Sequence, residues 1–281
     1  MEPVLFFFGE IPVYTYTVVV DVALIAGMGA VIAAGRRRGW AADTLIEAAV
    51  PVLAAAVVGA RLAYVGAHWP AYQDFPLATL YIWEGGLDLG GALAAGTVMV
   101  LVVARIARVP TPAALDVAAL GVLVAIPTGR LGCIPGACAY GMVLPAVWGW
   151  PLPDVNGEML PRFPSQVVEA AAETLLAGGL WLLARRSAWL AGSAAAGALG
   201  GYGAIHLATA AWREDIAIIG PLTLGMLWAI LALAAAVLMT GVTRQWIPSP
   251  PGILSILDME RVWFFRRKRQ GEERGHVGQN G

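Results

Sequence analysis

Apolar residues fill this chain in runs of about 20, and short polar segments separate the runs. An α-helix of that length crosses roughly 30 Å of hydrocarbon and satisfies its own backbone hydrogen bonds. The pattern predicts seven such helices, at about 14–35, 46–67, 89–107, 112–132, 166–184, 189–210 and 216–241. The sequence therefore indicates an all-α membrane protein with seven transmembrane helices.

Composition supports this class and suggests the domain boundaries. Hydrophobic residues make up 59% of the chain and charged residues only 13%, against roughly 25% charged residues in an ordinary soluble domain. We expect one seven-helix transmembrane domain over 1–246 and a basic, partly disordered cytoplasmic tail over 247–281. The tail is either a positively charged stop signal or a segment that lies on anionic lipid. Its basic cluster is short and follows a span, which argues against nucleic-acid binding.

The distribution of basic residues predicts which side each loop faces. All but four of the 18 Lys and Arg residues lie on one side of the predicted spans, at 36–38, 105, 108, 185, 186 and from 244 onward. Cytoplasmic loops carry such an excess, so the amino terminus is predicted outside and the carboxyl terminus in the cytoplasm. The two long connections, 68–88 and 133–165, then lie outside, where loops of this length commonly carry function.

The stretch 129–141, GRLGCIPGACAYG, places an arginine directly after an apolar run. A charge in the hydrocarbon costs about 2.5–3.5 kcal/mol on insertion scales, so Arg130 is predicted to be functional and to have an anionic partner. The alternative is that its side chain only reaches up to the interface. Asp116 stands 14 residues earlier on the same predicted helix. That spacing is about four turns, so Asp116 is expected to pair with a different donor.

The same stretch holds both cysteines of the chain, Cys133 and Cys138. A disulfide is possible at this spacing on an oxidising face of the membrane. The alternatives are small buried thiols, a reactive thiolate favoured by Arg130, or metal ligands. No His or carboxylate stands at ligand spacing, so we predict no metal site.

The stretch also resembles the signature of the prolipoprotein diacylglyceryl transferases, G-R-x-G-N-F-x-N-x-E-x-x-G. Four further features match that family in the same order along the chain: Gly59–Tyr64, Trp83–Gly86 with Gly90–Gly91, Asp116, and Pro164–Glu169. The resemblance covers nearly the whole chain. It implies a multi-pass enzyme of the bacterial cytoplasmic (inner) membrane, with 1–246 as the transferase-like domain.

The resemblance further implies the reaction and its partners. Such an enzyme moves the diacylglyceryl group of phosphatidylglycerol to the lipobox cysteine thiol of a prolipoprotein signal peptide, and glycerol phosphate leaves. It works in the lipid bilayer, and no cofactor is expected. The leaving phosphate gains charge as the carbon–oxygen bond breaks, so a guanidinium in a dry site would stabilise the transition state.

These considerations select the candidate site residues. We predict catalytic roles for Arg130, His206 and Tyr16, and the candidates for substrate binding are Arg61, Gly85, Gly86, Gly129, Gly132, Gly141, Tyr202 and Arg213. Arg130 is the first choice for the phosphate, with Arg61 second and Arg213 third. Tyr16 matches a family tyrosine by position, and it could equally be an interface anchor.

The chain departs from the family pattern at several polar positions. The signature positions for asparagine, a second asparagine and glutamate hold Cys133, Gly136 and Cys138, a motif histidine is replaced by Leu89, and His206 and Ala210 stand for an arginine and a glutamate. One account is a divergent transferase in which His206 serves as base or cation. Another is the same fold acting on a different lipid or thiol substrate, with a cysteine as the reactive centre. A third is a lipid-binding or transport protein without covalent chemistry.

Overall fold

The structure is a computed structural model that describes residues 4–82, 85–154, 156–186 and 192–245. The tail predicted at 247–281 lies outside the described residues, as do Trp83 and Glu84 of the tryptophan motif.

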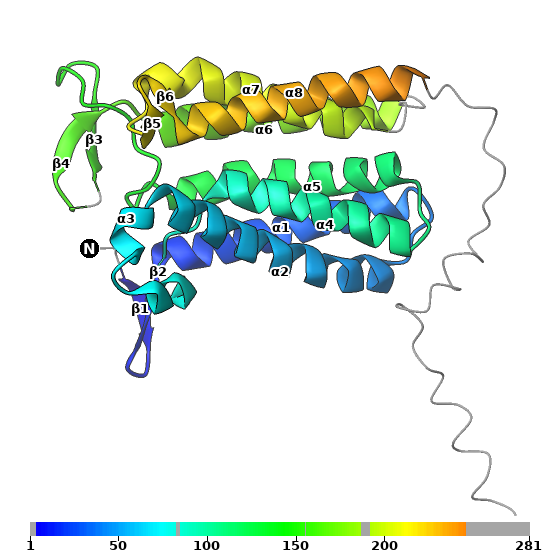
Figure 1. The fold of residues 1–281 in the computed structure, drawn as a ribbon, viewed down its shortest axis with the longest axis horizontal. Coiled ribbons are helices and arrows are strands. Elements are labelled where there is room, and N and C mark those ends of the chain that lie inside the picture. Colours follow the sequence, from blue (N-terminus) through cyan, green and yellow to red (C-terminus); the bar gives the residue numbers. More distant parts are fainter. Residues whose placement is uncertain (1–3, 83–84, 155, 187–191, 246–281) are drawn as a thin grey trace, which may run out of the picture.

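Long helices lie side by side and form most of the described chain (Figure 1). They are α1 (Thr15–Arg36), α2 (Ala42–Ala67), α4 (Leu89–Ile106), α5 (Thr111–Gly132), α6 (Ser165–Arg186), α7 (Ser193–Thr209) and α8 (Leu224–Gln245). Within the described residues, six of them are long and apolar enough to cross a membrane. The remaining one, α7, has 17 residues. The chain is therefore a polytopic membrane protein with a mostly helical structure.

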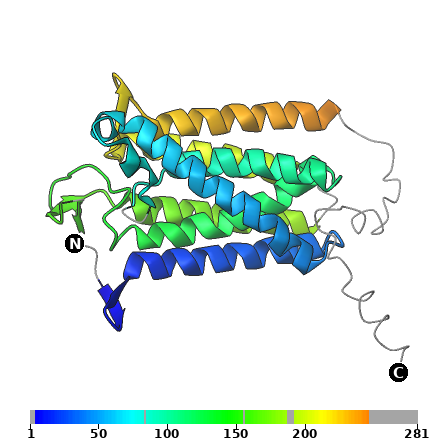
Figure 2. The ribbon, with the colours of Figure 1, turned by 60° about the horizontal axis from the view of Figure 1, so that its bottom comes forward.

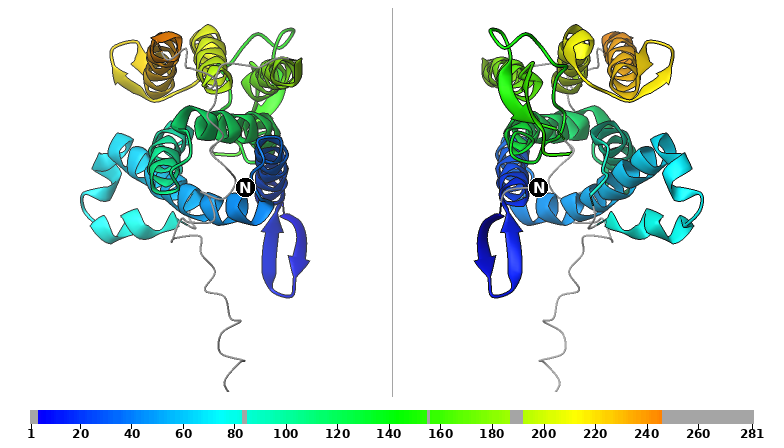
Figure 3. Two further views of the ribbon diagram at one scale, coloured as in Figure 1. Left: turned by 90° about the vertical axis from the view of Figure 1, so that its right-hand side faces the viewer. Right: turned by 90° about the vertical axis from the view of Figure 1, so that its left-hand side faces the viewer.

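Helix α5 lies at the centre of the bundle. It packs against α1 and α4 on one side and against α6 and α7 on the other. Helix α2 packs against α4, and α8 packs against α7. Viewed along the bundle, α6, α7 and α8 form a row beside α5, with α1, α2 and α4 on its opposite side (Figure 3). Residues on α5 can thus meet residues from both halves.

Glycines let α7 approach α6 closely. A Cβ atom added to Gly197 would meet the side chain of Leu180, and one added to Gly201 would meet that of Leu176. These two glycines are four residues apart and lie on one face of α7. The small face brings α7 close enough for its polar residues to contact those of α6 and α5.

One end of the bundle carries strands as well as short helices, so the protein is mostly helical rather than all-α as predicted. Three antiparallel strand pairs lie at this end, which we call the hairpin end (Figure 2). They are β1 (Val4–Phe8) with β2 (Ile11–Tyr14), β3 (Trp150–Pro153) with β4 (Met159–Arg162), and β5 (Ala217–Ile219) with β6 (Leu222–Thr223). The short helices α3 (Trp69–Tyr72), η1 (Pro76–Leu80) and η3 (Ala210–Trp212) complete it.

The last span begins later than predicted for a local reason. Gly220 has a φ of +56°, which glycine adopts readily, and it turns 217–223 into the β5–β6 hairpin. Helix α8 therefore begins at Leu224 rather than near 216. Hydropathy cannot separate these residues from the helix because Ile216, Ile218 and Ile219 are as apolar as the helix itself.

Asp116 fixes the start of α7 at the other end of the bundle. Its carboxylate is 1% exposed. One oxygen accepts from the Arg38 guanidinium at 3.0 Å and from the Gly192 N–H at 2.9 Å, and the other accepts from the Ala195 N–H at 3.0 Å. Asp116 thus satisfies amide groups that the first turn of α7 leaves unpaired. The prediction that it pairs with donors other than Arg130 is confirmed.

We expect Asp116→Ala to destabilise the protein by about 2–4 kcal/mol, because two buried amides and a guanidinium lose their acceptor. Thermal unfolding in detergent would measure the loss. Asp43→Ala is the matched control, since that carboxylate is exposed at the start of α2. Equal melting temperatures for the two variants would contradict this role.

Candidate active site at the hairpin end

The buried guanidinium of Arg130 has a partner at each of its three nitrogens. The residue lies on the last turn of α5 and is 6% exposed. Nη1 lies 2.5 Å from Glu169 Oε2, Nε donates to Glu173 Oε2 at 2.7 Å, and Nη2 contacts His206 Nε2. The anionic partner predicted for Arg130 is therefore present.

Both carboxylates come from α6. Glu169 and Glu173 are 0% and 1% exposed. They are four residues apart and so lie on the same face of the helix, which α6 turns toward α5. Two carboxylates around one guanidinium compensate the charge that Arg130 carries away from water.

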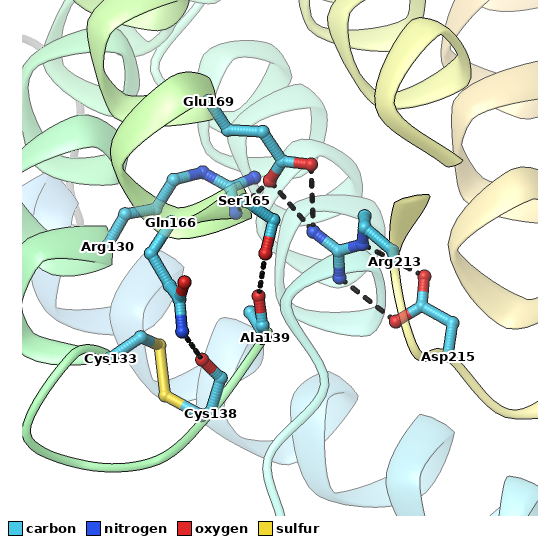
Figure 4. Close-up of a disulfide and its surroundings, with 9 residues drawn as sticks. All are labelled: Arg130, Cys133, Cys138, Ala139, Ser165, Gln166, Glu169, Arg213 and Asp215. Atoms are coloured by element: carbon cyan, nitrogen blue, oxygen red, sulfur yellow. Dashed lines mark hydrogen bonds and ion pairs between the residues drawn. A yellow bond between two sulfur atoms is a disulfide. The ribbon is translucent and has the colours of Figure 1, made fainter. Parts of the chain in front are cut away.

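Glu169 is shared between two arginines (Figure 4). The Nη1 of Arg213, which follows η3, donates to both carboxylate oxygens at 3.0 and 2.8 Å. The Thr209 hydroxyl adds a third donor at 2.5 Å. Arg213 makes a second, two-pronged contact with Asp215, at 3.1 and 3.0 Å. Arg130 and Arg213 therefore lie on either side of one carboxylate.

His206 of α7 completes this cluster. A guanidinium can only donate, so the contact with Arg130 assigns His206 Nε2 as an acceptor on a neutral ring with its proton on Nδ1. The same nitrogen lies 3.7 Å from Glu173 Oε1 and 4.0 Å from Glu169 Oε2. The Tyr202 ring lies beside the imidazole, with 4.2 Å between ring centroids. Four of the predicted site residues, Arg130, His206, Tyr202 and Arg213, are thus brought together. We call them, with Glu169 and Glu173, the Arg130 cluster.

Cys133 and Cys138 form a disulfide, which decides among the alternatives for this pair. They are the only two cysteines of the chain. The pair is therefore neither a free nucleophilic thiol, nor two buried thiols, nor a pair of metal ligands. The disulfide closes a loop that rests on the start of α6, where Ser165 Oγ donates to the Ala139 carbonyl at 2.6 Å and Gln166 Nε2 donates to the Cys138 carbonyl at 3.0 Å.

The signature glycines make room for neighbouring residues. A Cβ atom on Gly132 would lie 3.2 Å from Val19 and 3.5 Å from the Tyr16 ring, both on α1. At Gly141 it would lie 2.8 Å from the carbonyl oxygen of Trp212. Gly129 is less crowded, with Ala23 at 3.9 Å. Tyr16 therefore lies against the end of α5 and the loop that follows it.

Arg61 lies elsewhere and holds a loop. The residue is 6% exposed. Its guanidinium donates to the carbonyls of Thr79 at 2.9 Å, Ala78 at 2.8 Å, Gly85 at 2.6 Å and Gly86 at 3.1 Å. Gly85 and Gly86 have φ of +85° and +75°, which turns their carbonyls toward Arg61. Among the described residues, no hydrogen bond or ion pair joins Arg61 to the Arg130 cluster.

A second arginine centre stabilises the hairpin end outside the spans. Arg162 of β4 pairs with Glu214 at 2.5 Å and Asp154 at 3.3 Å and lies over the Tyr140 ring at 4.5 Å. Backbone N–H groups, first that of Glu158, lower the pKa of Asp154, and Arg162 adds to this effect.

The burial of Arg213 would lower its pKa, but the charges of Glu169 and Asp215 outweigh burial and raise the pKa above its usual value. Asp154 and Arg213 thus each stay charged at neutral pH.

The sequence motifs did not single out Glu173. The signal was nevertheless present, because Glu173 is a second carboxylate one helical turn after Glu169 inside a predicted span. An ionisable residue at that depth faces the bundle interior by default. Within the described residues, no group of three His, Cys, Asp or Glu is arranged to hold a metal ion.

The cluster can bind an anionic ligand and can accept a proton. The guanidinium groups of Arg130 and Arg213 flank the Glu169 carboxylate, and a neutral imidazole nitrogen lies beside them. Guanidinium groups bind phosphate oxygens in pairs, and a neutral imidazole can take a proton near neutral pH. The fold and this cluster together define a polytopic membrane protein with a buried, charge-paired arginine site at one end of its bundle.

The comparisons with known proteins identify the family. The chain belongs to the prolipoprotein diacylglyceryl transferase family, whose profile matches residues 3–242. It is similar to proteins named phosphatidylglycerol–prolipoprotein diacylglyceryl transferase in three bacteria. The identity is 32% over 217 residues in Paracidovorax citrulli, 76% of this chain and 73% of the relative. For the Methylocella silvestris protein the identity is 30% over 276 residues, which cover 89% of this chain and 97% of the relative. For the Halalkalibacterium halodurans protein it is 31% over 155 residues, which cover 55% of this chain and 52% of the relative.

We expect Arg61→Lys to loosen the loop between α2 and α4, because one ammonium cannot replace a fork that reaches four carbonyls. Stability should fall by about 1–3 kcal/mol. Chymotrypsin, which cuts after aromatic residues, should cleave this loop faster than in the wild type. Arg105→Lys, at an exposed position near the far end of α4, is the control. Unchanged cleavage in Arg61→Lys would show that the loop does not depend on the fork.

Proposed function

We propose that this chain transfers the diacylglyceryl group of phosphatidylglycerol to the lipobox cysteine thiol of a prolipoprotein and releases glycerol phosphate. The observation that carries the proposal is the buried guanidinium of Arg130, held beside Arg213 by a carboxylate that both arginines share. Membership of the family and the names of the relatives support the same reaction.

The proposal includes an orientation in the membrane. All seven long helices span it, with the amino terminus outside and the carboxyl terminus in the cytoplasm of a bacterium. The distribution of basic residues supports this topology. The 17 residues of α7 extend about 26 Å, and α7 packs against α6 and α8 along the bundle. The hairpin end then faces outward, on the side where exported prolipoproteins arrive.

Phosphate binding takes place by exchange. In the resting site, Glu169 occupies the guanidinium groups of both Arg130 and Arg213. A phosphodiester presents oxygens with the same charge and similar geometry, so it replaces carboxylate contacts one for one. The guanidinium groups then face the phosphate whose charge grows as the carbon–oxygen bond breaks. They stabilise that transition state more than the bound substrate.

The exchange also frees the proton acceptor. As Arg130 turns toward the phosphate, His206 Nε2 loses the donor that occupies it in this structure. The nitrogen then accepts the proton of the substrate thiol, and the sulfur attacks the glyceryl carbon as the bond to the phosphate oxygen breaks. Glu173 Oε1, 3.7 Å from the same nitrogen, stabilises the resulting imidazolium. The proton later leaves with the glycerol phosphate.

The other candidate residues support this centre. Tyr202 positions the imidazole by ring contact. Tyr16 closes the side of the site formed by α1, where Gly132 makes room for its ring. Gly141 takes part through close packing of the signature stretch, and Gly129 precedes Arg130 on the last turn of α5. Arg61, Gly85 and Gly86 shape the neighbouring loop over which the lipid headgroup enters.

Arg130→Ala should abolish transfer while the protein still inserts. The assay is complementation of a bacterial strain depleted of its own transferase, with mass spectrometry of thioether-lipid attachment to a reporter lipoprotein. Loss of a buried guanidinium at the phosphate should reduce turnover by at least about 10²-fold. Arg105→Ala is the control, because Arg105 is exposed at the far end of α4. A stably inserted Arg130→Ala protein with full lipidation would overturn the proposed function.

His206→Gln should lower kcat by about 10²–10⁴-fold, because the amide cannot take up the thiol proton. Acid conditions protonate the imidazole, so wild-type kcat/KM should fall as pH decreases, and this acid limb should be missing in the variant. Purified protein in vesicles, assayed across pH, gives both results. His68→Gln, outside the cluster, is the control. An unchanged pH profile in His206→Gln would exclude His206 as the base.

A further inference from the structure

Gln166 has one half of its amide fixed and the other half unpartnered. The residue lies on the first turn of α6 and is 1% exposed. Its Nε2 donates to the Cys138 carbonyl at 3.0 Å. Its Oε1 is buried and has no hydrogen-bond partner among the described residues. A buried acceptor without a donor is costly, so each such atom calls for an explanation.

The orientation of this amide is set by its surroundings. The Cys138 carbonyl can only accept, so the amide nitrogen must face it and the oxygen must point the other way. Figure 4 shows the nitrogen turned toward the disulfide loop and the oxygen turned away from it. The neighbouring donor is already used, since the Ser165 hydroxyl donates to the Ala139 carbonyl. Gln166 Oε1 is therefore a fixed acceptor beside the Arg130 cluster.

Its position along α6 matches the shape of the substrate. Gln166 lies three residues before Glu169, which places it about 4.5 Å further toward the hairpin end. In phosphatidylglycerol the headgroup glycerol extends from the phosphate toward water. With the phosphate at Arg130 and Arg213, as proposed above, the headgroup glycerol would lie next to Gln166.

We infer that Gln166 Oε1 accepts a hydrogen bond from a hydroxyl of the glycerol headgroup and so selects this lipid. The inference rests on the proposed function. A hydroxyl needs one acceptor, which a single neutral oxygen supplies. An ammonium headgroup carries three donors, and burying it with one acceptor leaves the others unsatisfied. A headgroup without donors leaves Oε1 itself unpaired.

The test compares two lipids with the same phosphodiester. Phosphatidylpropanol has the three carbons of the glycerol headgroup but neither hydroxyl. The full-length protein in vesicles is assayed with each lipid and a lipobox peptide as acceptor. Wild type should prefer phosphatidylglycerol by roughly ten- to hundredfold in kcat/KM, because a site built for a hydroxyl rejects the analogue without it. In Gln166→Met the preference should fall to within about threefold.

Further variants separate recognition from support of the disulfide loop. Gln166→Glu keeps an oxygen acceptor but loses the donor to Cys138, so it should keep a preference of at least about tenfold. Thr174→Met, at an exposed position on the same helix, should behave as wild type. If the role of Gln166 were purely structural, Gln166→Met would lower kcat/KM equally for both lipids and leave the preference intact. That result would overturn the inference.

Two other results would also overturn it. Equal use of both lipids by wild type would do so without any variant. A rise in KM for the peptide alone in Gln166→Met would show that Oε1 serves the thiol. Failure of wild type to use phosphatidylglycerol at all would instead overturn the proposed function, so the two failures are distinguishable.

Discussion

The pairing of the Arg130 charge inside the bundle is the constraint on which the site depends. A guanidinium that is almost completely buried must be compensated by groups from neighbouring helices. Helix α6 supplies two carboxylates, α7 supplies an imidazole, and the segment after η3 supplies a second guanidinium that shares one of the carboxylates. The close approach of α7 to α6 at glycines allows the groups on α7 and after η3 to meet those of α6.

The parts of this structure that could be predicted follow from local physics. Long apolar runs predicted the helices to within a few residues for α1, α4, α5 and α6, because bilayer thickness fixes their length. A charge in such a run demands a partner, which predicted an anion for Arg130. Helical spacing alone separated Asp116 from Arg130. The motif resemblance then predicted His206 and Arg213 as candidate site residues from the sequence alone.

The remaining features depend on contacts between distant segments. Apolar hairpins such as β5–β6 have the same hydropathy as a helix, so only a glycine turn reveals them. Arg61 has a side chain that could bind phosphate, yet its guanidinium donates to loop carbonyls later in the chain. The state of Cys133 and Cys138 depends on how the loop folds against Ser165 and Gln166. Spacing permits a disulfide but cannot require one.

The carboxylate shared by two arginines also bears on turnover. In the proposed mechanism, Glu169 would compete with every anion that enters the site, the product included. A phosphate monoester carries more charge than the diester and would otherwise bind these guanidinium groups more tightly. An internal competitor that returns to its place weakens retention of the product and resets the site in one movement. On this mechanism the resting ion pairs would displace the product, and each guanidinium would exchange one anion for another without a stage in which its charge is unpaired.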